Sequence, residues 1–314
     1  MSKVQPLVSI LINNYNYELY LREAIESALN QTYPNTEVIV VDDGSTDKSP
    51  EIIASYQNRI ISVFKQNGGQ ASAFNTGFEV SRGEIICLLD SDDIWLPQKV
   101  EKVVEAFCSY PGAAVVYHCV QNIDKAGVAI GKPWPPYKPI RGNISSQVAK
   151  TGGWWPYPPS TALSFSREYM CQVMNVPEGK YQIGADSYLA DLAPFWGEVV
   201  GIDRVFSHYR IHDSHYGWSN QDKIQENIKT NRELQYYKLR INVLNDALKR
   251  LGLDLEVSLA DNWPYQLLQY KLGKEKTLIS LSLVAIRNPW EHRLVSKLKT
   301  IALLWLKRHN ISRI

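Results

Sequence analysis

The chain has 314 residues, of which 45% are hydrophobic and 21% are charged, a composition typical of a soluble globular protein rather than a disordered or fibrous one. This length predicts one large domain with an appendage. The formal net charge of +2 argues against a dedicated nucleic-acid-binding protein, which is usually far more basic, so we expect no nucleic-acid partner.

The charge is distributed unevenly along the chain. From residue 265 onward ten Lys and Arg residues face two acids, so this part carries +8 and the remainder −6. The four cysteines are scattered without a CxxC pair, which favours a reduced compartment and argues against a zinc site. We see neither a secretory leader nor an apolar run near the roughly 20 residues of a membrane-spanning helix. We therefore expect a cytoplasmic protein.

Strand and helix patterns alternate through the first hundred residues. Continuous apolar runs, typical of buried parallel strands, lie at 8–12, 38–41, 60–64 and 85–89. Between these runs apolar residues recur at helical spacing, at 20–29, at 45–56 and at 71–80. This order predicts a parallel sheet with right-handed crossover connections.

The pattern is less regular after residue 96. We predict a helix at 97–110, strands at 113–120, 161–165 and 199–209, and a helix at 186–192. Residues 121–160 are rich in Gly, Pro and Trp, and we predict a partly ordered active-site loop there, because loops of this length in compact domains are usually functional. From about residue 220 the pattern is helical and increasingly basic.

Polar residues follow three of the predicted strands where each strand ends. The segments are Asn13-Asn14-Tyr15-Asn16, Asp42-Asp43-Gly44-Ser45 and Asp90-Ser91-Asp92-Asp93. Ligands of open parallel sheets bind at the carboxyl ends of the strands, so we expect these segments to form one site. A tyrosine face can stack on a nucleobase, and an Asp-x-Asp pair can hold Mg²⁺ or Mn²⁺ beside a diphosphate. Each segment alone is more often a turn or a helix cap, so the combination carries the interpretation.

Six separated motifs extend over about two-thirds of the chain. They are VSILINNYN (8–16), ALNQTYPNTEVIVVDDGSTD (28–47), KQNGGQASAFNTGF (65–78), SRGEIICLLDSDDIWLP (81–97), GADSYL (184–189) and YRIH (209–212). In this order they resemble the family 2 glycosyltransferases, which are inverting enzymes of the GT-A fold. The resemblance implies an α/β catalytic domain at 1–215 with a Rossmann-like, mostly parallel sheet. Its donor-binding half is expected at about 1–97, its acceptor-binding half at about 98–215, and a helical, basic C-terminal extension at 216–314.

The resemblance also implies a nucleotide-diphosphate sugar as donor, with UDP as the expected nucleotide. It places Asn13, Tyr15 and Asp43 against the nucleoside and Asp90 near the ribose. The other candidate donor-binding residues are Ser91, Asn75 and Arg210.

The same resemblance assigns a metal and a base. Asp92 is expected to bind Mn²⁺ or Mg²⁺, which stabilises the departing nucleoside diphosphate. Asp186 is expected to take the proton of an acceptor hydroxyl. Arg210 and His212 flank one residue of a predicted strand and so point to the same side, where they reach the diphosphate or complete the metal shell. A structural hydrogen bond is the alternative for His212, and a helix cap the alternative for Asp186.

Three positions depart from the family pattern. Many members have proline where Asn13 stands, arginine where Phe74 stands, and an acid where Ala185 stands. The absence of arginine leaves charge neutralisation more fully to the metal.

The acceptor is expected to be a glycan, a lipid-linked sugar or another hydroxyl compound, in surface-polysaccharide or glycan assembly. Trp154 and Trp155 are candidates for a wall on which an acceptor sugar stacks, and the alternative is an ordinary core or loop-clamping role. Residues 290–309 combine apolar residues at helical spacing with five basic ones. They predict either peripheral contact with the inner face of a membrane or a helix docked on the body or in a homo-oligomer.

Two other functions compete with this interpretation. A nucleotidyltransferase that makes nucleotide sugars usually has a glycine-rich, basic loop after its first strand, which residues 13–16 lack. A non-catalytic nucleotide- or glycan-binding module would not need Asp43, Asp90, Asp92 and Asp186 together.

Overall fold

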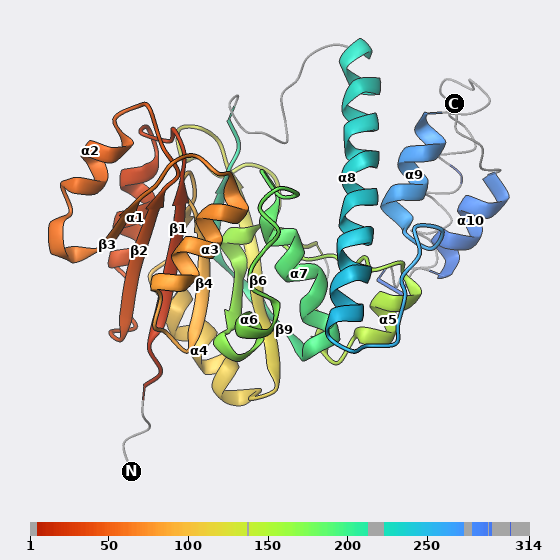
Figure 1. The fold of residues 1–314 in the computed structure, drawn as a ribbon, viewed down its shortest axis with the longest axis horizontal. Coiled ribbons are helices and arrows are strands. Elements are labelled where there is room, and N and C mark those ends of the chain that lie inside the picture. The colour runs from red at the N-terminus through yellow and green to blue at the C-terminus, as the bar shows by residue number, and fades with distance from the viewer. Residues whose placement is uncertain are drawn as a thin grey trace. The chain divides into compact units, whose positions relative to one another are not determined.

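The computed structural model describes residues 5–136, 138–212, 223–272, 278–287, 289–290 and 302 (Figure 1). The chain divides into two compact units. The first unit comprises Met1–Ile144 and Tyr157–Ser219, and the C-terminal unit comprises Ser145–Pro156 and Asn220–Ile314.

The first unit is built on one mixed sheet. Its strands are β1 (Val8–Asn14), β2 (Thr36–Asp42), β3 (Ile61–Phe64), β4 (Ile85–Asp90), β5 (Ile94–Trp95), β6 (Ala113–Ile123), β7 (Arg141–Gly142), β8 (Leu163–Ser166) and β9 (Glu198–Arg210). They lie in the order β3-β2-β1-β4-β8-β6-β9-β5, and β7 pairs with β9. The strands β3, β2, β1 and β4 are mutually parallel, as predicted, whereas β8 runs antiparallel between β4 and β6.

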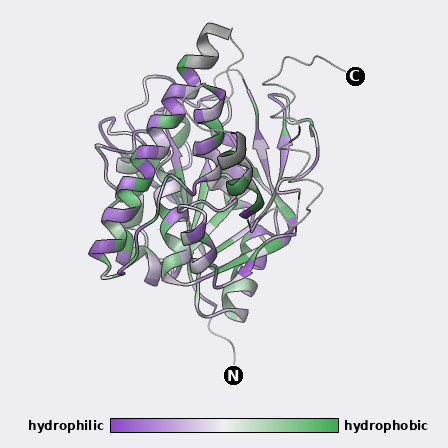
Figure 2. Ribbon diagram, turned by 90° about the vertical axis from the view of Figure 1, so that its right-hand side faces the viewer, coloured by the Kyte–Doolittle hydropathy of each residue, from purple (hydrophilic) through white to green (hydrophobic). Residues whose placement is uncertain are grey.

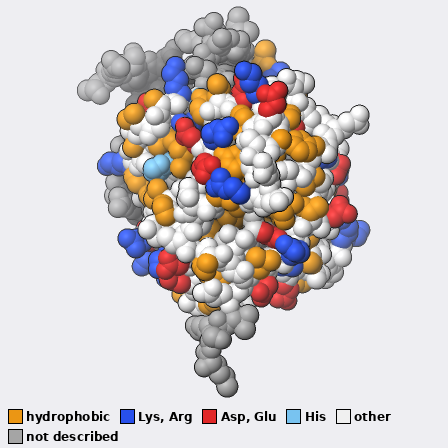
Figure 3. All heavy atoms as spheres, turned by 90° about the vertical axis from the view of Figure 1, so that its left-hand side faces the viewer, with side chains coloured by type: hydrophobic (Ala, Val, Ile, Leu, Met, Phe, Trp, Pro, Cys, Tyr) orange, Lys and Arg blue, Asp and Glu red, His pale blue; other side chains and the backbone are white. Residues whose placement is uncertain are grey.

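Helices connect these strands. They are α1 (Leu21–Leu29), α2 (Ser49–Ala54), α3 (Gln70–Val80), α4 (Lys99–Ser109), α6 (Arg167–Val173) and α7 (Ala185–Trp196). Acidic and basic side chains are interspersed on the side of this unit where α2 lies (Figure 3).

The core lies on both faces of the sheet because the central strands are apolar at successive positions. On one face Ile10 and Ile12 of β1 pack in a cluster with Ile25 of α1 and Val103 of α4, all fully buried. On the other face α3 approaches so closely that a Cβ on Gly77 would lie 3.2 Å from Cγ2 of Val41. Each such buried aliphatic side chain contributes about 1.5–3 kcal/mol to folding.

The C-terminal unit is helical, as predicted. Its helices are α5 (Ser145–Lys150), α8 (Lys223–Arg250), α9 (Trp263–Lys271) and α10 (Leu278–Arg287). Hydrophilic and hydrophobic residues alternate along α8 (Figure 2), and the residues buried at helical spacing are Leu234, Ile241, Leu244 and Leu248. Asn262 caps the N-terminus of α9, because its side chain accepts a hydrogen bond from the Tyr265 amide and donates one to the Gly152 carbonyl.

One sequence prediction changes here, and another falls almost entirely outside the described residues. The expected active-site loop over 121–160 is not one segment, because residues 145–156, which begin with α5, belong to the C-terminal unit. Gly153 shows the reason: a Cβ there would lie 2.7 Å from Leu244 and 3.1 Å from Ile241 of α8, so the chain packs tightly on this helix. The predicted amphipathic helix at 290–309 lies outside the described residues, except for residues 290 and 302. No helix in the described part of the chain is both long and apolar enough to cross a bilayer.

Candidate active site

The register of the sheet brings the polar strand ends together. Asn13 of β1 pairs with Asp90 of β4, and Asn14 pairs with Asp42 of β2. The Asn14 side-chain amide donates to the Asp42 carboxylate at 2.9 Å, and the Ser91 hydroxyl donates to the Asn13 carbonyl at 2.6 Å. The three polar segments therefore form one edge of the first unit.

Four acids share one electrostatic environment at this edge. Burial, then the charges of Asp92 and Asp186, raise the pKa of Asp90 to about 7, although a hydrogen bond from Ser160 at 2.5 Å opposes this. Burial, then Asp92 and Asp90, also raise the pKa of Asp93 well above its usual range. Asp186 comes from the first turn of α7, far from the other three in sequence. A divalent cation relieves this kind of mutual repulsion between carboxylates.

One imidazole completes the cluster. Nε2 of His212 lies 3.0 Å from Oδ2 of Asp92, and both side chains are buried. Because His212 follows the end of β9 and Asp92 follows β4, two separate strands present them to each other. A nitrogen and a carboxylate oxygen at this distance form a pair that can share either a proton or a metal ion.

The described residues could supply only part of a metal shell. Among the described residues, no group of three His, Cys, Asp or Glu side chains is arranged to hold a cation. Mg²⁺ and related ions commonly take one or two protein ligands and fill the remaining positions with substrate phosphates and water. The Asp92–His212 pair fits a cation of this kind.

Arg210, which the sequence predicted to reach the diphosphate, instead contacts other residues of the chain. Its guanidinium is only 2% exposed. It donates to the Asp92 carbonyl at 2.8 Å, to the Lys125 carbonyl at 3.1 Å and to the Glu23 carboxylate at 2.6 Å. These partners occupy all three guanidinium nitrogens, so the structure does not direct this side chain at a donor.

Asp43 holds the loop that follows β3. Its carboxylate accepts hydrogen bonds from Lys65 at 2.7 Å, from the Gly68 amide at 3.0 Å and from the Gly69 amide at 2.7 Å. Gly69 has φ +86°, and a Cβ there would lie 2.9 Å from Cα of Gln182. Asp43 therefore sets the backbone of residues 65–69, whatever further contact it makes with a nucleoside.

Asn75 holds a second loop. Its side chain donates to the Val176 carbonyl at 2.9 Å and to Glu178 at 3.0 Å, and it accepts from the Val176 amide at 2.8 Å. These contacts differ from the predicted one with the donor. They fasten the segment that leads to Asp186. Gln70 fastens the same segment: its side chain accepts a hydrogen bond from the Ala185 amide at 2.9 Å, and its backbone amide donates one to the Gln182 carbonyl.

Two candidate nucleoside-binding residues differ in exposure. The side chain of Tyr15 is 46% exposed, so its ring can receive a stacked base. Both polar side-chain atoms of Asn13 are buried and have no hydrogen-bond partner within the described residues. Leaving such a group unsatisfied costs about 1–3 kcal/mol, which a bound ligand can recover.

Trp154 and Trp155 were predicted to form a wall on which an acceptor sugar stacks, and the structure does not place Trp155 for this role. Trp155 is completely buried, so it has no exposed face for a sugar, and the alternative of a core aromatic matches the structure. Trp154 is partly buried in the C-terminal unit, where its carbonyl accepts from Thr151 and from the indole of Trp290 at 3.1 Å.

Sequence reasoning missed several residues of this site. Tyr17 and Tyr20 place their rings 6.0 and 4.9 Å from the ring of His212, and Ser160 contacts Asp90. Tyr20 and Glu23 resemble ordinary residues at the start of a helix, and the only sequence signal was their nearness to the segment 13–16.

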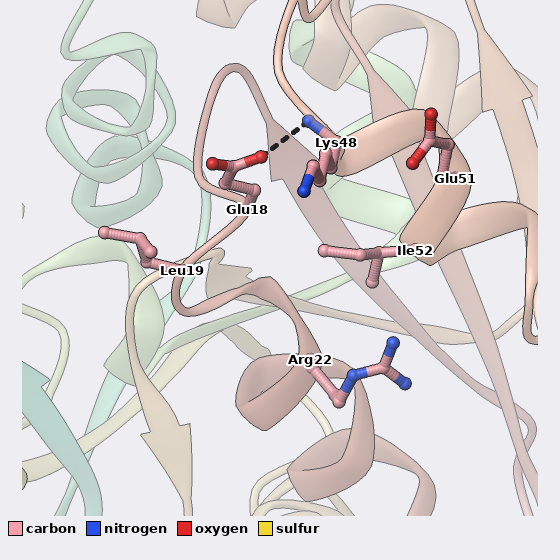
Figure 4. Close-up of a pocket in the computed structure, with 6 residues that line it drawn as sticks. All are labelled: Glu18, Leu19, Arg22, Lys48, Glu51 and Ile52. Atoms are coloured by element: carbon pink, nitrogen blue, oxygen red, sulfur yellow. Dashed lines mark hydrogen bonds between the residues drawn. The ribbon is translucent and has the colours of Figure 1, made fainter.

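A hollow of about 300 Å³ lies beside this edge, between the start of α1 and α2 (Figure 4). Its lining residues are Glu18, Leu19, Arg22, Lys48, Glu51 and Ile52. None of the four clustered acids is among them. We therefore do not assign the reaction to this hollow.

Comparison with known proteins identifies the family. The model of glycosyl transferase family 2 matches residues 9–169, about half of the chain. An uncharacterized glycosyltransferase of Nostoc sp. is 32% identical over 267 residues, covering 84% of this chain and 82% of its own length. Chondroitin synthase of Escherichia coli is 42% identical over 260 residues, which cover 79% of this chain but only 33% of the synthase. The chain thus spans about a third of that relative.

Solved structures show the same fold at low sequence identity. A fragment of TarS from S. aureus in complex with UDP-GlcNAc has a TM-score of 0.57 at 17% identity, covering 97% of this chain and 92% of that one. The mannosyltransferase PcManGT from Pyrobaculum calidifontis, in complex with GDP-Man and Mn²⁺, has a TM-score of 0.55 at 19% identity, covering 99% and 77%. These likenesses confirm the predicted GT-A fold with its helical C-terminal region. The family match favours the transferase over the nucleotidyltransferase alternative, and the chain belongs to glycosyl transferase family 2 as a glycosyltransferase of the GT-A fold.

Proposed function

We propose that this glycosyltransferase moves a sugar, with inversion, from a nucleotide-diphosphate donor to a hydroxyl of a growing glycan or lipid-linked acceptor, in surface-polysaccharide or glycan assembly. The observation that carries the proposal is the Asp92–His212 pair, 3.0 Å apart, inside a cluster of acids contributed by the end of β4 and the first turn of α7. UDP is the expected nucleotide. The TarS complex with UDP-GlcNAc supports this choice, and the match to chondroitin synthase supports a glycan acceptor.

Asp92 and His212 are the residues that would hold Mn²⁺ or Mg²⁺. When bound, such a cation neutralises the negative charge that the departing nucleoside diphosphate develops. The chain itself positions the donor: the exposed Tyr15 ring receives the base, and the buried amide of Asn13 pairs with polar atoms of the nucleoside. Asp43 acts by holding the loop 65–69 that borders the donor.

Asp186 is the proposed base. It lies on the first turn of α7, where the partial positive charge of the helix N-terminus favours a carboxylate. Its charge is felt by Asp90, which places it within electrostatic range of the strand ends. We propose that it accepts the proton of the acceptor hydroxyl while that oxygen bonds to the anomeric carbon and the bond to the diphosphate breaks on the opposite face. One displacement of this kind inverts the configuration.

The experiment is a panel of nucleotide sugars tested for donor hydrolysis with Mn²⁺, with Mg²⁺ and with EDTA. We expect turnover of at least one UDP-sugar that EDTA abolishes and added Mn²⁺ restores. Asp92→Asn should remove this activity, because it deletes an anionic ligand at nearly constant volume. The matched control is Asp203→Asn, since Asp203 is an exposed acid of β9 in the same unit. Full activity in EDTA, or in Asp92→Asn, would refute the proposed role of the metal.

A further inference from the structure

Side chains from the start of α1 contact His212 and Arg210. Tyr20 directly precedes α1, and its ring lies 4.9 Å from the ring of His212 and 4.7 Å from the guanidinium of Arg210. Glu23 lies in the first turn of the same helix and pairs with Arg210 at 2.6 Å. A single aromatic ring thus lies against both an expected metal ligand and a buried cation.

Arg210 connects this helix to the other expected ligand. Its Nε donates to the carbonyl of Asp92 at 2.8 Å, and its backbone amide donates to the carboxylate of Asp93 at 2.8 Å. The guanidinium therefore fixes the main chain of Asp92, and its own backbone lies two residues before His212. Burying this cation to 2% exposure is costly unless it is paired, and Glu23 supplies the charge that pairs with it.

We propose that Tyr20, Glu23 and Arg210 are positioning residues that hold Asp92 and His212 ready for a divalent cation bound together with the donor diphosphate; this inference rests on the proposed function. Ligands whose orientation is already fixed lose less conformational freedom on binding, so the affinity for the cation rises. Arg210 and Glu23 touch neither donor nor acceptor in this scheme. They act through Asp92 and His212.

The test measures Mn²⁺ binding directly, from the decrease of the free Mn²⁺ signal in electron paramagnetic resonance, with UDP present and no sugar transferred. We expect Glu23→Gln to weaken Mn²⁺ binding about tenfold, the lower end of what substituting a residue outside the ligands themselves costs. Arg210→Lys cannot make the same set of contacts, and we expect it to weaken binding more than Glu23→Gln does. Of two Tyr20 variants, Tyr20→Phe keeps the ring and should bind Mn²⁺ more tightly than Tyr20→Leu.

The matched control is Glu26→Gln. Glu26 lies on the same helix and pairs with Arg59 at 3.5 Å, away from the acid cluster. Urea unfolding of each variant, followed by circular dichroism, shows whether the fold is kept. Glu23→Gln is the decisive variant, because Glu23 is 56% exposed at its side chain and its substitution leaves the shape unchanged. If it binds Mn²⁺ as tightly as Glu26→Gln does, the positioning role is refuted. If the wild-type enzyme with UDP binds no Mn²⁺, the proposed metal centre itself fails.

Discussion

We predict that His118 makes the stability of the first unit depend on pH. Its ring is fully buried in β6, where Nδ1 donates to the Cys119 carbonyl at 3.0 Å and the ring packs edge-on against Phe206 at 5.7 Å. Burial, and then the charge of the equally buried Lys99, lower the pKa of His118 to about 3. In the unfolded chain the same group titrates at about 6.5.

The sign follows from proton binding. Between the two pKa values the unfolded chain binds a proton that the folded chain does not, so the contribution to stability is complete above about pH 6.5 and is lost as the pH falls toward about 3. From about pH 7.5 to about pH 5, His118 alone should lower the free energy of unfolding by about 2 kcal/mol. His118→Phe removes the titrating group and keeps a ring against Phe206.

The assay is urea unfolding of the wild type and His118→Phe, followed by circular dichroism at several pH values. The variant loses the hydrogen bond to Cys119 at every pH, so only the change with pH carries information. We expect the wild type to lose about 2 kcal/mol relative to the variant between about pH 7.5 and about pH 5. A difference that stays constant over this range would show that His118 is not held neutral by burial.

Three further predictions concern the site and the C-terminal region. Asp186→Asn should lower turnover by orders of magnitude with little change in donor affinity, because a base acts only in the transition state. Near-normal turnover would show that another residue is the base, and Glu178 would be the next candidate. Gly69→Ala should raise the KM for the donor, because the added Cβ would collide with Gln182. The control is Gly127→Ala, since Gly127 has a similar φ of +85° and its Cβ would meet no atom within 4 Å; equal KM values for the two variants would contradict this prediction. Truncation before Pro289 should release the protein from anionic vesicles in a sedimentation assay without affecting donor hydrolysis, because each basic residue near such a surface contributes about 1 kcal/mol to binding. Unchanged sedimentation would exclude membrane binding by this region.

The sheet could be predicted because its signals are local. A buried parallel strand shows as a continuous apolar run, and its polar end marks the edge where ligands bind, so the strands that end at Asn14, Asp42 and Asp90 were predicted, although each extends slightly further than its apolar run. The antiparallel insertion of β8 between β4 and β6 was not predictable in this way, because a strand of four residues with the sequence LSFS carries no information about its partners.

The side-chain contacts at the site lie beyond such reasoning. Arg210 pairs with Glu23, 187 residues earlier, and Asn75 pairs with Val176, 101 residues later. Both residues were predicted to face the donor, and in the structure both hold protein segments in place. Composition also could not show whether Trp155 is a buried aromatic residue or an exposed one on which a sugar stacks. The roles of Asp92, His212 and Asp186 stay predictions until the variants are measured.

The helix α3 has a consequence for how donor choice can change in evolution. Asp43 fastens the loop 65–69 at Gly69, just before the helix begins, and Asn75 fastens the segment leading to Asp186 five residues after Gln70, about 7.5 Å along the axis. The helix α3 therefore connects the loop 65–69 to the segment that leads to Asp186, the proposed base. Lengthening either the loop 65–69 or the segment that leads to Asp186 would disturb the contacts of both with α3. We expect enzymes built on this scaffold to acquire new donors by exchanging side chains rather than by lengthening these segments.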